Sequence, residues 1–577
     1  MTIPENERLT LELLEKHIGK SIWEITELER YRFGYFVQND HIIGLSLFSC
    51  GLSTIPQEIK SFSLLKEFYL RGNNLDSIPE ELCALSSLEI LDLSENHITK
   101  LPEFINLLSN LRELDLESNN LTAVPDTLGN ISSLELLDLS ENEISEIPSS
   151  LGNLINLRTL DLSGNNLDSL PDSIGSLKSL EILYLGKNKL TTLPESIGSL
   201  ASLKRLNLRN NLIKVLPESI GNLSLLGSFF LKGNELERLP NSIGKLSNLI
   251  YLGLTSNRLS YLPESIGSLI SLENLSVSSN NLLKLPNSIG SLKSLLRLEI
   301  SDNKLKILPE SIGELSSLQI LRCARNELTE IPYTIGDLQK LEVLILEINK
   351  IKKLPETIGQ LKSLKELNLH DNKIEILTEA IGDLPSLEIL DLEKNELVEL
   401  PESIGSLGSL IELDISTNKL ENIPHTIGSL PLIKNLMLGF NKLKTIPKSL
   451  GFLTSLEILD LGKNNLIEIP ETIGSLTSLK HLYLYYNEIE KIPESIGSLH
   501  SLKYLYLGNN RLNSLPATIR YLKKLKYLFL RTNNLTTLPD SLEALPALKY
   551  LNIEKNNLKG YLDLLDKLEI KGIKILK

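Results

Sequence analysis

The chain has 577 residues, of which 41% are hydrophobic and only 5% aromatic, and it carries a net charge of −14. This charge disfavours general binding to nucleic acid or to an anionic membrane, since both are polyanions. Three cysteines are too few for the disulfide framework typical of a long extracellular protein. No run approaches the ~20 apolar residues of a membrane span, and the first residues are acidic where a secretory signal is basic. We therefore expect a cytoplasmic protein with no membrane span.

Residues 1–41 differ in pattern from the rest of the chain and predict an N-terminal cap. Leu11, Leu14 and Ile18 recur among charged residues at the spacing of an amphipathic helix. A strand is expected to follow over residues 31–37. Trp23, the only tryptophan, is expected to be buried in this cap.

From residue 42 to residue 558 the sequence repeats with a period of 23 residues. Asparagine recurs 22 times from Asn73 to Asn556 without an insertion or deletion, and Cys50 occupies the same column one repeat earlier. Proline follows six residues after most of these asparagines, and glycine follows ten residues after them from Gly129 to Gly497. Units that cannot bury their apolar face alone are expected to stack, so the period predicts about 23 stacked repeats.

One unit, starting at Leu88, reads L-E-I-L-D-L-S-E-N-H-I-T-K-L-P. Leu91 and Leu93 alternate with Asp92, which predicts a short strand with leucine inward and aspartate outward. The general pattern L-x-x-L-x-L-x-x-N-x-L-x-x-L-P-x-x-I-G-x-L resembles leucine-rich repeat proteins. In particular, it is similar to the 23-residue class that includes the plant intracellular Ras-group-related and the animal Ras-scaffold leucine-rich repeat proteins. The resemblance implies an α/β solenoid, a horseshoe or superhelix with one continuous parallel sheet on its concave face.

The invariant columns have structural interpretations. The asparagine amide is expected to build a hydrogen-bond ladder with backbone groups of the adjacent turn. Proline fixes φ where the chain leaves that turn, and glycine permits a tight or left-handed backbone on the outer side. Residues 559–577 predict a C-terminal cap, with a short helix over residues 563–577.

No catalytic motif is present in the sequence. It contains no phosphate-binding loop, no kinase signature, no G-x-S-x-G nucleophile elbow and no C-x-x-C pair. The seven histidines lack metal-ligand spacing. We therefore predict no enzymatic activity, no cofactor and no metal.

The outward strand positions fall six, four and two residues before each repeat asparagine, and their composition changes along the chain. An acidic patch occupies these columns in two zones: Asp92, Asp115, Asp138 and Asp161, then Asp391, Asp414 and Asp460. A mixed stretch between the two zones contains Arg205, Arg209, Lys232, Arg297 and Arg322. Like charges on neighbouring strands repel one another, so a basic partner would relieve the acidic zones. The same pattern also suits a solvated face without a partner.

The C-terminal repeats carry what we call the tyrosine–lysine patch. Its outward residues and the lysines beside them are His481, Tyr483, Tyr485, Tyr504, Tyr506, Tyr527, Phe529, Arg531 and Tyr550, with Lys480, Lys503, Lys526 and Lys549. Residues 480–577 hold 16 basic and 9 acidic side chains, a net of +7, which leaves −21 for the remainder. Exposed tyrosine beside cations is typical of binding hot spots. Duplication of repeats would produce the same pattern without selection for binding.

These observations predict a non-enzymatic protein–protein interaction scaffold that binds its partner on the concave face, with a role in intracellular signalling as the expectation. By resemblance, a small GTPase or a phosphatase subunit would be a suitable partner. An architectural or self-associating repeat protein is the alternative. Binding of an anionic ligand or nucleic acid by the basic C-terminal end is the less favoured one, and no nucleic-acid partner is expected.

Overall fold

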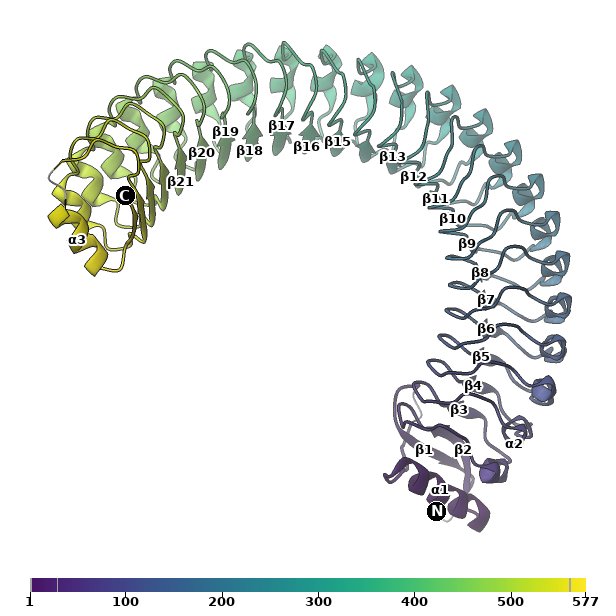
Figure 1. Cartoon of the computed structure of the whole chain (residues 1–577). Coiled ribbons are helices and arrows are strands. Elements are labelled where there is room, and N and C mark those ends of the chain that lie inside the picture. The colour runs from purple at the N-terminus through teal and green to yellow at the C-terminus, as the bar shows by residue number, and fades with distance from the viewer. Residues whose placement is uncertain (1–2, 28–29, 560–561) are drawn as a thin grey trace. The chain divides into compact units, whose positions relative to one another are not determined.

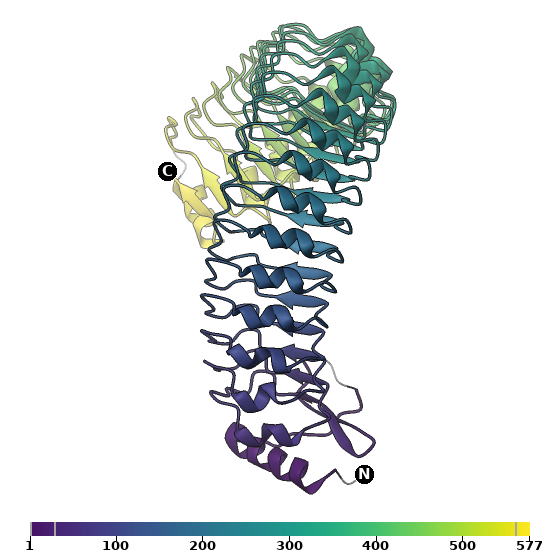
Figure 2. The same cartoon turned by 90° about the vertical axis from the view of Figure 1, so that its right-hand side faces the viewer.

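The computed structural model describes residues 3–27, 30–559 and 562–577. It divides into two compact units, Met1–Leu282 and Leu283–Lys577. In each unit the strands follow one another along one face, called here the strand face, and short helical turns lie on the opposite face (Figure 1). Figure 2 shows the helical turns of the first unit stacked one above the next.

The first unit contains two α-helices, α1 (Glu5–Ile18) and α2 (Glu80–Cys83), and 3₁₀ turns from Gln57–Ser61 to Glu264–Ser268. Its strands are β1 Gly34–Gln38, β2 His41–Ser46, β3 Glu67–Tyr69, β4 Ile90–Asp92, β5 Glu113–Asp115, β6 Leu136–Asp138, β7 Thr159–Asp161, β8 Ile182–Tyr184, β9 Arg205–Asn207, β10 Ser228–Phe230, β11 Tyr251–Gly253 and β12 Asn274–Ser276.

The second unit contains 3₁₀ turns from Asn287–Ser291 to Asp540–Ala544 and ends with helix α3 (Leu562–Ile570) and a final strand. Its strands are β13 Arg297–Glu299, β14 Ile320–Arg322, β15 Val343–Ile345, β16 Glu366–Asn368, β17 Ile389–Asp391, β18 Glu412–Asp414, β19 Asn435–Met437, β20 Ile458–Asp460, β21 His481–Tyr483, β22 Tyr504–Tyr506, β23 Tyr527–Phe529, β24 Tyr550–Asn552 and β25 Lys574–Leu576.

Neighbouring repeat strands pair in parallel, and each residue lies opposite its equivalent in the next repeat. Leu252 of β11, for example, pairs with Phe229 of β10 and Leu275 of β12. The inward leucines and isoleucines of each repeat are buried and form the core. Burial of ~25 cal/mol per Å² of apolar surface is the main stabilising contribution to such a core. The predicted α/β solenoid of about 23 parallel-stranded repeats is confirmed in both units.

The repeat asparagine bridges two successive repeats, as the sequence predicts. Asn257 is only 8% exposed. Its Oδ1 accepts the backbone N–H of Leu236 at 3.0 Å. Its Nδ2 donates to the backbone oxygen of Leu231 at 2.9 Å and to that of Leu254 at 3.0 Å. A single amide therefore satisfies buried backbone groups of its own repeat and of the preceding one.

The repeat proline lies directly before the 3₁₀ turn of its repeat. Pro263 has φ −68° and ψ 151° at the position before the turn. Thr378 replaces this proline in one repeat, yet it keeps φ −66° and ψ 147°. Its hydroxyl accepts the N–H of Ala380, so a side-chain cap compensates for the missing ring.

The role predicted for the glycine column is wrong in its physical cause. These glycines are absent from the positive-φ residues of the described chain. A Cβ on Gly244 would instead lie 2.4 Å from the backbone oxygen of Ser265, in the turn of the next repeat. Glycine is required there because successive turns approach closely. The left-handed residue is the one directly before each repeat asparagine, whether it is Gly233 (φ 72°) or Thr417 (φ 57°).

The N-terminal cap agrees with the sequence in its helix but not in its tryptophan. Leu11 and Leu14 of α1 are buried, as expected. Trp23, in contrast, is 70% exposed, and the neighbouring Ile22 is buried, so the expectation of a buried tryptophan is wrong. The strand predicted over residues 31–37 is β1, which pairs antiparallel with β2. The sheet of the first unit is therefore not parallel throughout.

The C-terminal cap contains a shorter helix than the sequence predicts. Helix α3 ends at Ile570, and β25 follows and pairs in parallel with β24. Leu564, Leu565 and Leu568 of α3 are buried. The final strand thus continues the sheet, and the helix packs beside it.

Removing one amide of the asparagine ladder should destabilise the first unit strongly. Asn257→Ala leaves several buried backbone groups without partners, and each costs about 1–3 kcal/mol. We expect the free energy of unfolding to fall by about 3 kcal/mol in urea denaturation. Asn222→Ala, at an exposed asparagine, is the matched control and should change it by less than about 0.5 kcal/mol. Equal effects of the two substitutions would contradict the structural role of the ladder.

Candidate partner-binding surfaces on the strand face

The aromatic residues of the tyrosine–lysine patch form two stacked columns along β21–β24. In the first column the ring centroids of His481 and Tyr504 are 4.4 Å apart, and those of Tyr504 and Tyr527 are 4.8 Å apart. These pairs are parallel within 9° and 3°. The strand register produces the stack, because it places each ring directly opposite its equivalent.

The second column lies beside the first on the same strands. The ring centroids of Tyr483 and Tyr506 are 4.8 Å apart, and those of Tyr506 and Phe529 are 4.4 Å apart. Tyr550 is tilted against Phe529 at 5.1 Å, which ends the regular stack. The sequence-predicted aromatic residues of these strands are therefore brought together on one surface.

Tyr485 lies at the edge of this surface, two residues after β21. Its ring is perpendicular to that of Tyr483 at 6.4 Å. It lies over Gly462 of the preceding repeat, where a Cβ would come within 2.5 Å of the ring. The glycine therefore allows the ring to lie against the backbone and extends the aromatic surface toward β20.

The rings are half-buried, and their polar groups are held in the neutral state. Burial and the nearby phenols raise the pKa of Tyr483 and Tyr506. Burial, together with the charges of Lys503 and Lys480, lowers the pKa of His481. At neutral pH Tyr483, Tyr506 and His481 therefore present uncharged phenol and imidazole groups that can donate and accept hydrogen bonds.

The lysine row lies in one column beside the rings. The backbone N–H of Lys503 donates to the oxygen of Lys480, and that of Lys526 to the oxygen of Lys503. The Lys480 ammonium forms an ion pair with Glu457 at 2.5 Å. Lys503, Lys526 and Lys549 form no ion pair within residues 3–27, 30–559 and 562–577. Arg531 has a carboxylate 3.7 Å away, that of Glu554. Positive charge thus remains available along this row.

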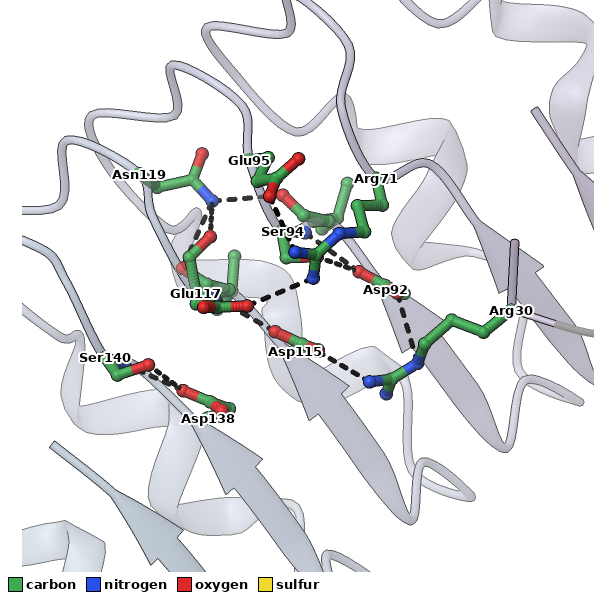
Figure 3. Close-up of polar contacts among 12 residues, drawn as sticks. Arg30, Arg71, Asp92, Ser94, Glu95, Asp115, Glu117, Asn119, Asp138 and Ser140 are labelled. Atoms are coloured by element: carbon green, nitrogen blue, oxygen red, sulfur yellow. Dashed lines mark hydrogen bonds and ion pairs between the residues drawn. The ribbon is translucent and has the colours of Figure 1, made fainter. Parts of the chain in front are cut away.

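The acidic patch of the first unit is not an open surface at its N-terminal end, which corrects the sequence prediction. Asp92 and Asp115 are buried, at 0% and 4% exposure. Arg30, from the N-terminal cap, contacts both: its Nε lies 3.3 Å from Asp92 and its Nη1 3.2 Å from Asp115 (Figure 3). Arg71 pairs with Glu95 and Glu117 beside them. These acidic side chains are therefore neutralised within the chain.

Aspartate in this column has a local structural role that the sequence analysis missed. The Oδ1 of Asp138 accepts the N–H of Ser140, two residues later, at 2.9 Å. The same contact is made by the other aspartates of the acidic patch: Asp92, Asp115, Asp161, Asp391, Asp414 and Asp460. Asn207 makes it in a repeat without aspartate. The replacement of Asp by Asn at this position in some repeats is the sequence feature that could have indicated this hydrogen-bonding role.

Stacking carboxylates on neighbouring strands raises their pKa values. Burial and the charge of Asp92 raise the pKa of Asp115 to about 7, although Arg30 opposes the shift. Burial, with the charges of Asp138 and Glu117, raises the pKa of Asp161 to about 6, against the hydrogen bonds from Ser163. The ionised ladder is therefore a destabilising feature of the fold at neutral pH.

The free energy of unfolding should depend on pH because the pKa of Asp161 is raised in the folded chain. Between pH ~4 and pH ~6 the folded Asp161 holds a proton that the unfolded residue has lost, so the free energy of unfolding falls as pH rises. Asp161→Asn keeps an acceptor for the N–H of Ser163 and cannot ionise. We expect it to stabilise the chain by about 1–2 kcal/mol at pH 7.5, since solvent screens part of the shift, and to match the parent chain at pH 4.

Urea denaturation between pH 4 and pH 7.5 measures this difference. Asp172→Asn, an exposed position on a 3₁₀ turn, is the control and should leave the pH profile unchanged. Parallel profiles for Asp161→Asn and the parent chain would show that the ladder carries no such penalty.

Other site types are not formed by the described residues. In that part of the chain no group of three or more His, Cys, Asp and Glu side chains could hold a metal ion. Nor does any helix there have the length and apolar character needed to cross a bilayer. The surfaces described above are therefore the candidates for function.

Comparison with family models identifies the repeat. The model described as leucine-rich repeat region matches residues 45–146, 135–210, 195–281, 241–326, 289–374 and 364–461. The model described as leucine rich repeat matches residues 454–512 and 502–558. The comparison with curated proteins found no match.

Several solved receptors are similar to the chain over most of its length. The plant peptide hormone receptor RGFR1, in complex with RGF2, is 29% identical with a TM-score of 0.65, and the match covers 94% of this chain and 93% of that one. The Arabidopsis receptor kinase HAESA, in complex with the peptide hormone IDA and the co-receptor SERK1, is 27% identical with a TM-score of 0.63, covering 99% and 95%. A TDR receptor is 28% identical with a TM-score of 0.63, covering 83% and 91%.

Proposed function

Because the chain belongs to the leucine-rich repeat family, we propose that it is a non-enzymatic scaffold whose protein partner docks on the tyrosine–lysine patch. The observation that carries this proposal is the pair of stacked aromatic columns beside a row of lysines, of which Lys503, Lys526 and Lys549 form no ion pair among the described residues. Tyrosine offers large contact area at a small entropic cost. The similar receptors RGFR1 and HAESA are in complex with peptide hormones or a co-receptor, which supports a protein or peptide as the partner.

The lysine row defines the charge of the partner. Three ammonium groups that have no carboxylate partner in the described part of the chain lie along the aromatic columns, so the docking segment should carry acidic residues. Ring edges and phenol groups provide the apolar contacts and the hydrogen bonds. The partner surface is therefore expected to combine acidic and apolar side chains.

We also propose that the chain belongs to the 23-residue class and acts in cytoplasmic signalling, with residues 42–558 as the binding solenoid. The uninterrupted period and the L-P-x-x-I-G-x-L segment support the class. Cys83 and Cys323 are buried as free thiols, and burial raises the pKa of Cys83 to about 12. Unreactive thiols of this kind suit a reducing compartment.

Loss of the tyrosines should abolish partner capture. Tyr483→Ala, Tyr506→Ala and Tyr527→Ala in one chain remove rings from both stacked columns. We expect affinity capture of the partner from native cytosol to fall at least tenfold, as for truncation of hot-spot residues. The captured protein is identified by mass spectrometry and then tested for direct binding as a purified protein.

The matched control removes three exposed tyrosines outside the patch: Tyr261→Ala, Tyr333→Ala and Tyr521→Ala. This chain should capture the partner as the parent chain does. Undiminished capture by the patch variant would exclude the patch. If the captured species is a second copy of the chain, the mass in solution doubles and the self-associating alternative is favoured, through attraction between the acidic columns and the basic end.

A further inference from the structure

A window without acidic side chains lies on the strand face of the first unit. From β8 to β12 none of the positions six, four and two residues before the repeat asparagine is Asp or Glu, although the chain has 73 acidic residues. The same positions hold Arg205 and Arg209, at β9, and Lys232, after β10. We call these three side chains, with Phe230, the cationic window.

The cationic window is held together by an aromatic ring. The guanidinium carbon of Arg205 lies 5.0 Å from the centroid of the Phe230 ring, and that of Arg209 lies 4.5 Å from it. Tyr251 of the next strand packs against Phe230 at 4.8 Å. Gly253 leaves room for the Tyr251 ring, since a Cβ there would lie 2.8 Å from it. Cation–π contacts of this kind fix both arginines before any ligand arrives.

The charges of the cationic window have no partner within the described residues. Arg205, Arg209 and Lys232 form neither an ion pair nor a side-chain hydrogen bond there, and the Nε of Arg209 is buried with no acceptor. Arg71 and Arg158 of the same unit, in contrast, each contact two glutamates. A buried donor without an acceptor is energetically costly. An anionic ligand would provide the acceptor atoms that the described residues do not.

We propose that the cationic window binds a phosphate monoester carried by a segment of a protein partner. Three positive charges match a phosphomonoester, which carries close to two negative charges at neutral pH, better than a single carboxylate. The guanidinium group offers paired donors that suit phosphate oxygens. The inference concerns a different unit from the tyrosine–lysine patch and does not depend on the function proposed for it.

The neighbouring strands limit the size of the anion. Asp138 of β6 and Asp161 of β7 follow each other on the strand face toward the N-terminus, and their carboxylates repel any anion that extends in that direction. A nucleic acid or another polyanion would meet this repulsion, while one isolated phosphate group would not. The cationic window therefore favours a single phosphorylated residue.

Binding of small probes to the full chain tests the assignment. The probes are the N-acetyl amides of phosphoserine, phosphotyrosine and glutamate, together with inorganic phosphate, titrated at low salt and followed by isothermal titration calorimetry. We expect the phosphoamino-acid amides to bind more tightly than the glutamate amide and inorganic phosphate. In Arg205→Gln/Arg209→Gln their affinity should fall at least tenfold.

The matched control is Arg112→Gln/Arg158→Gln, which changes the charge of the same unit equally at two arginines paired with Glu135. It should leave probe affinity unchanged. Lys232→Gln, at an exposed position, tests the site without altering the arginines and should weaken binding about threefold.

Each other outcome overturns the proposal. Absence of phosphoamino-acid binding to the parent chain, or equal losses in both double variants, would show that no phosphate site exists. Equal affinity for the glutamate amide would make the cationic window a carboxylate site. Tighter binding of inorganic phosphate than of the amides would assign it to the free ion.

Discussion

The rest of the structure depends on the bridge that each repeat asparagine makes to the preceding repeat. The amide of Asn257 satisfies backbone groups on both sides of one turn, and the same contacts recur throughout both units. Because the bridge has the same geometry each time, neighbouring repeat strands within each unit pair in the same register. Residues of one sequence column therefore lie next to one another, about 4.8 Å apart across the strands. Surface chemistry then follows from which residue type fills a column over several successive repeats.

Column stacking has opposite consequences for different side chains. Aromatic rings are stabilised by this stacking: the centroids of Tyr504 and Tyr527 are 4.8 Å apart in nearly parallel planes. Ionised carboxylates are destabilised in such a column: burial and the acidic neighbours raise the pKa of Asp161 to about 6. The chain tolerates the acidic columns because each aspartate also accepts a backbone N–H and, at the N-terminal end, because Arg30 contacts Asp92 and Asp115. An acidic column therefore has an internal explanation, whereas three lysines of the tyrosine–lysine patch have no ion-pair partner among the described residues.

Periodicity allowed most of the fold to be predicted, and the failures lie where the cause is not periodic or not local. The repeat length, the parallel strands and the asparagine ladder follow from spacing and elementary hydrogen bonding. The reason for the glycine column does not, because the backbone oxygen that excludes a Cβ at Gly244 belongs to the next repeat. The contact of Arg30 with Asp92 joins an aperiodic cap to a distant strand, and no column comparison could reveal it. Trp23 is exposed while its neighbour Ile22 is buried, a choice that hydrophobicity alone does not decide.

The repeat also explains why unpaired cations identify candidate sites in this chain. Many exposed lysines and arginines pair with a carboxylate 23 residues away, in the same column of the adjacent repeat, as Lys204 does with Glu181 and Lys419 with Glu396. Such pairs neutralise charge locally and contribute little stability at exposed positions. A cation cannot form such a pair where the adjacent repeats place an aromatic, neutral or basic residue in that column. Arg205 and Arg209 meet this condition around Phe230, and Lys503 and Lys526 meet it beside the stacked tyrosines. In a chain with a net charge of −14, these are positions at which an acidic partner gains attraction without having to displace an internal carboxylate.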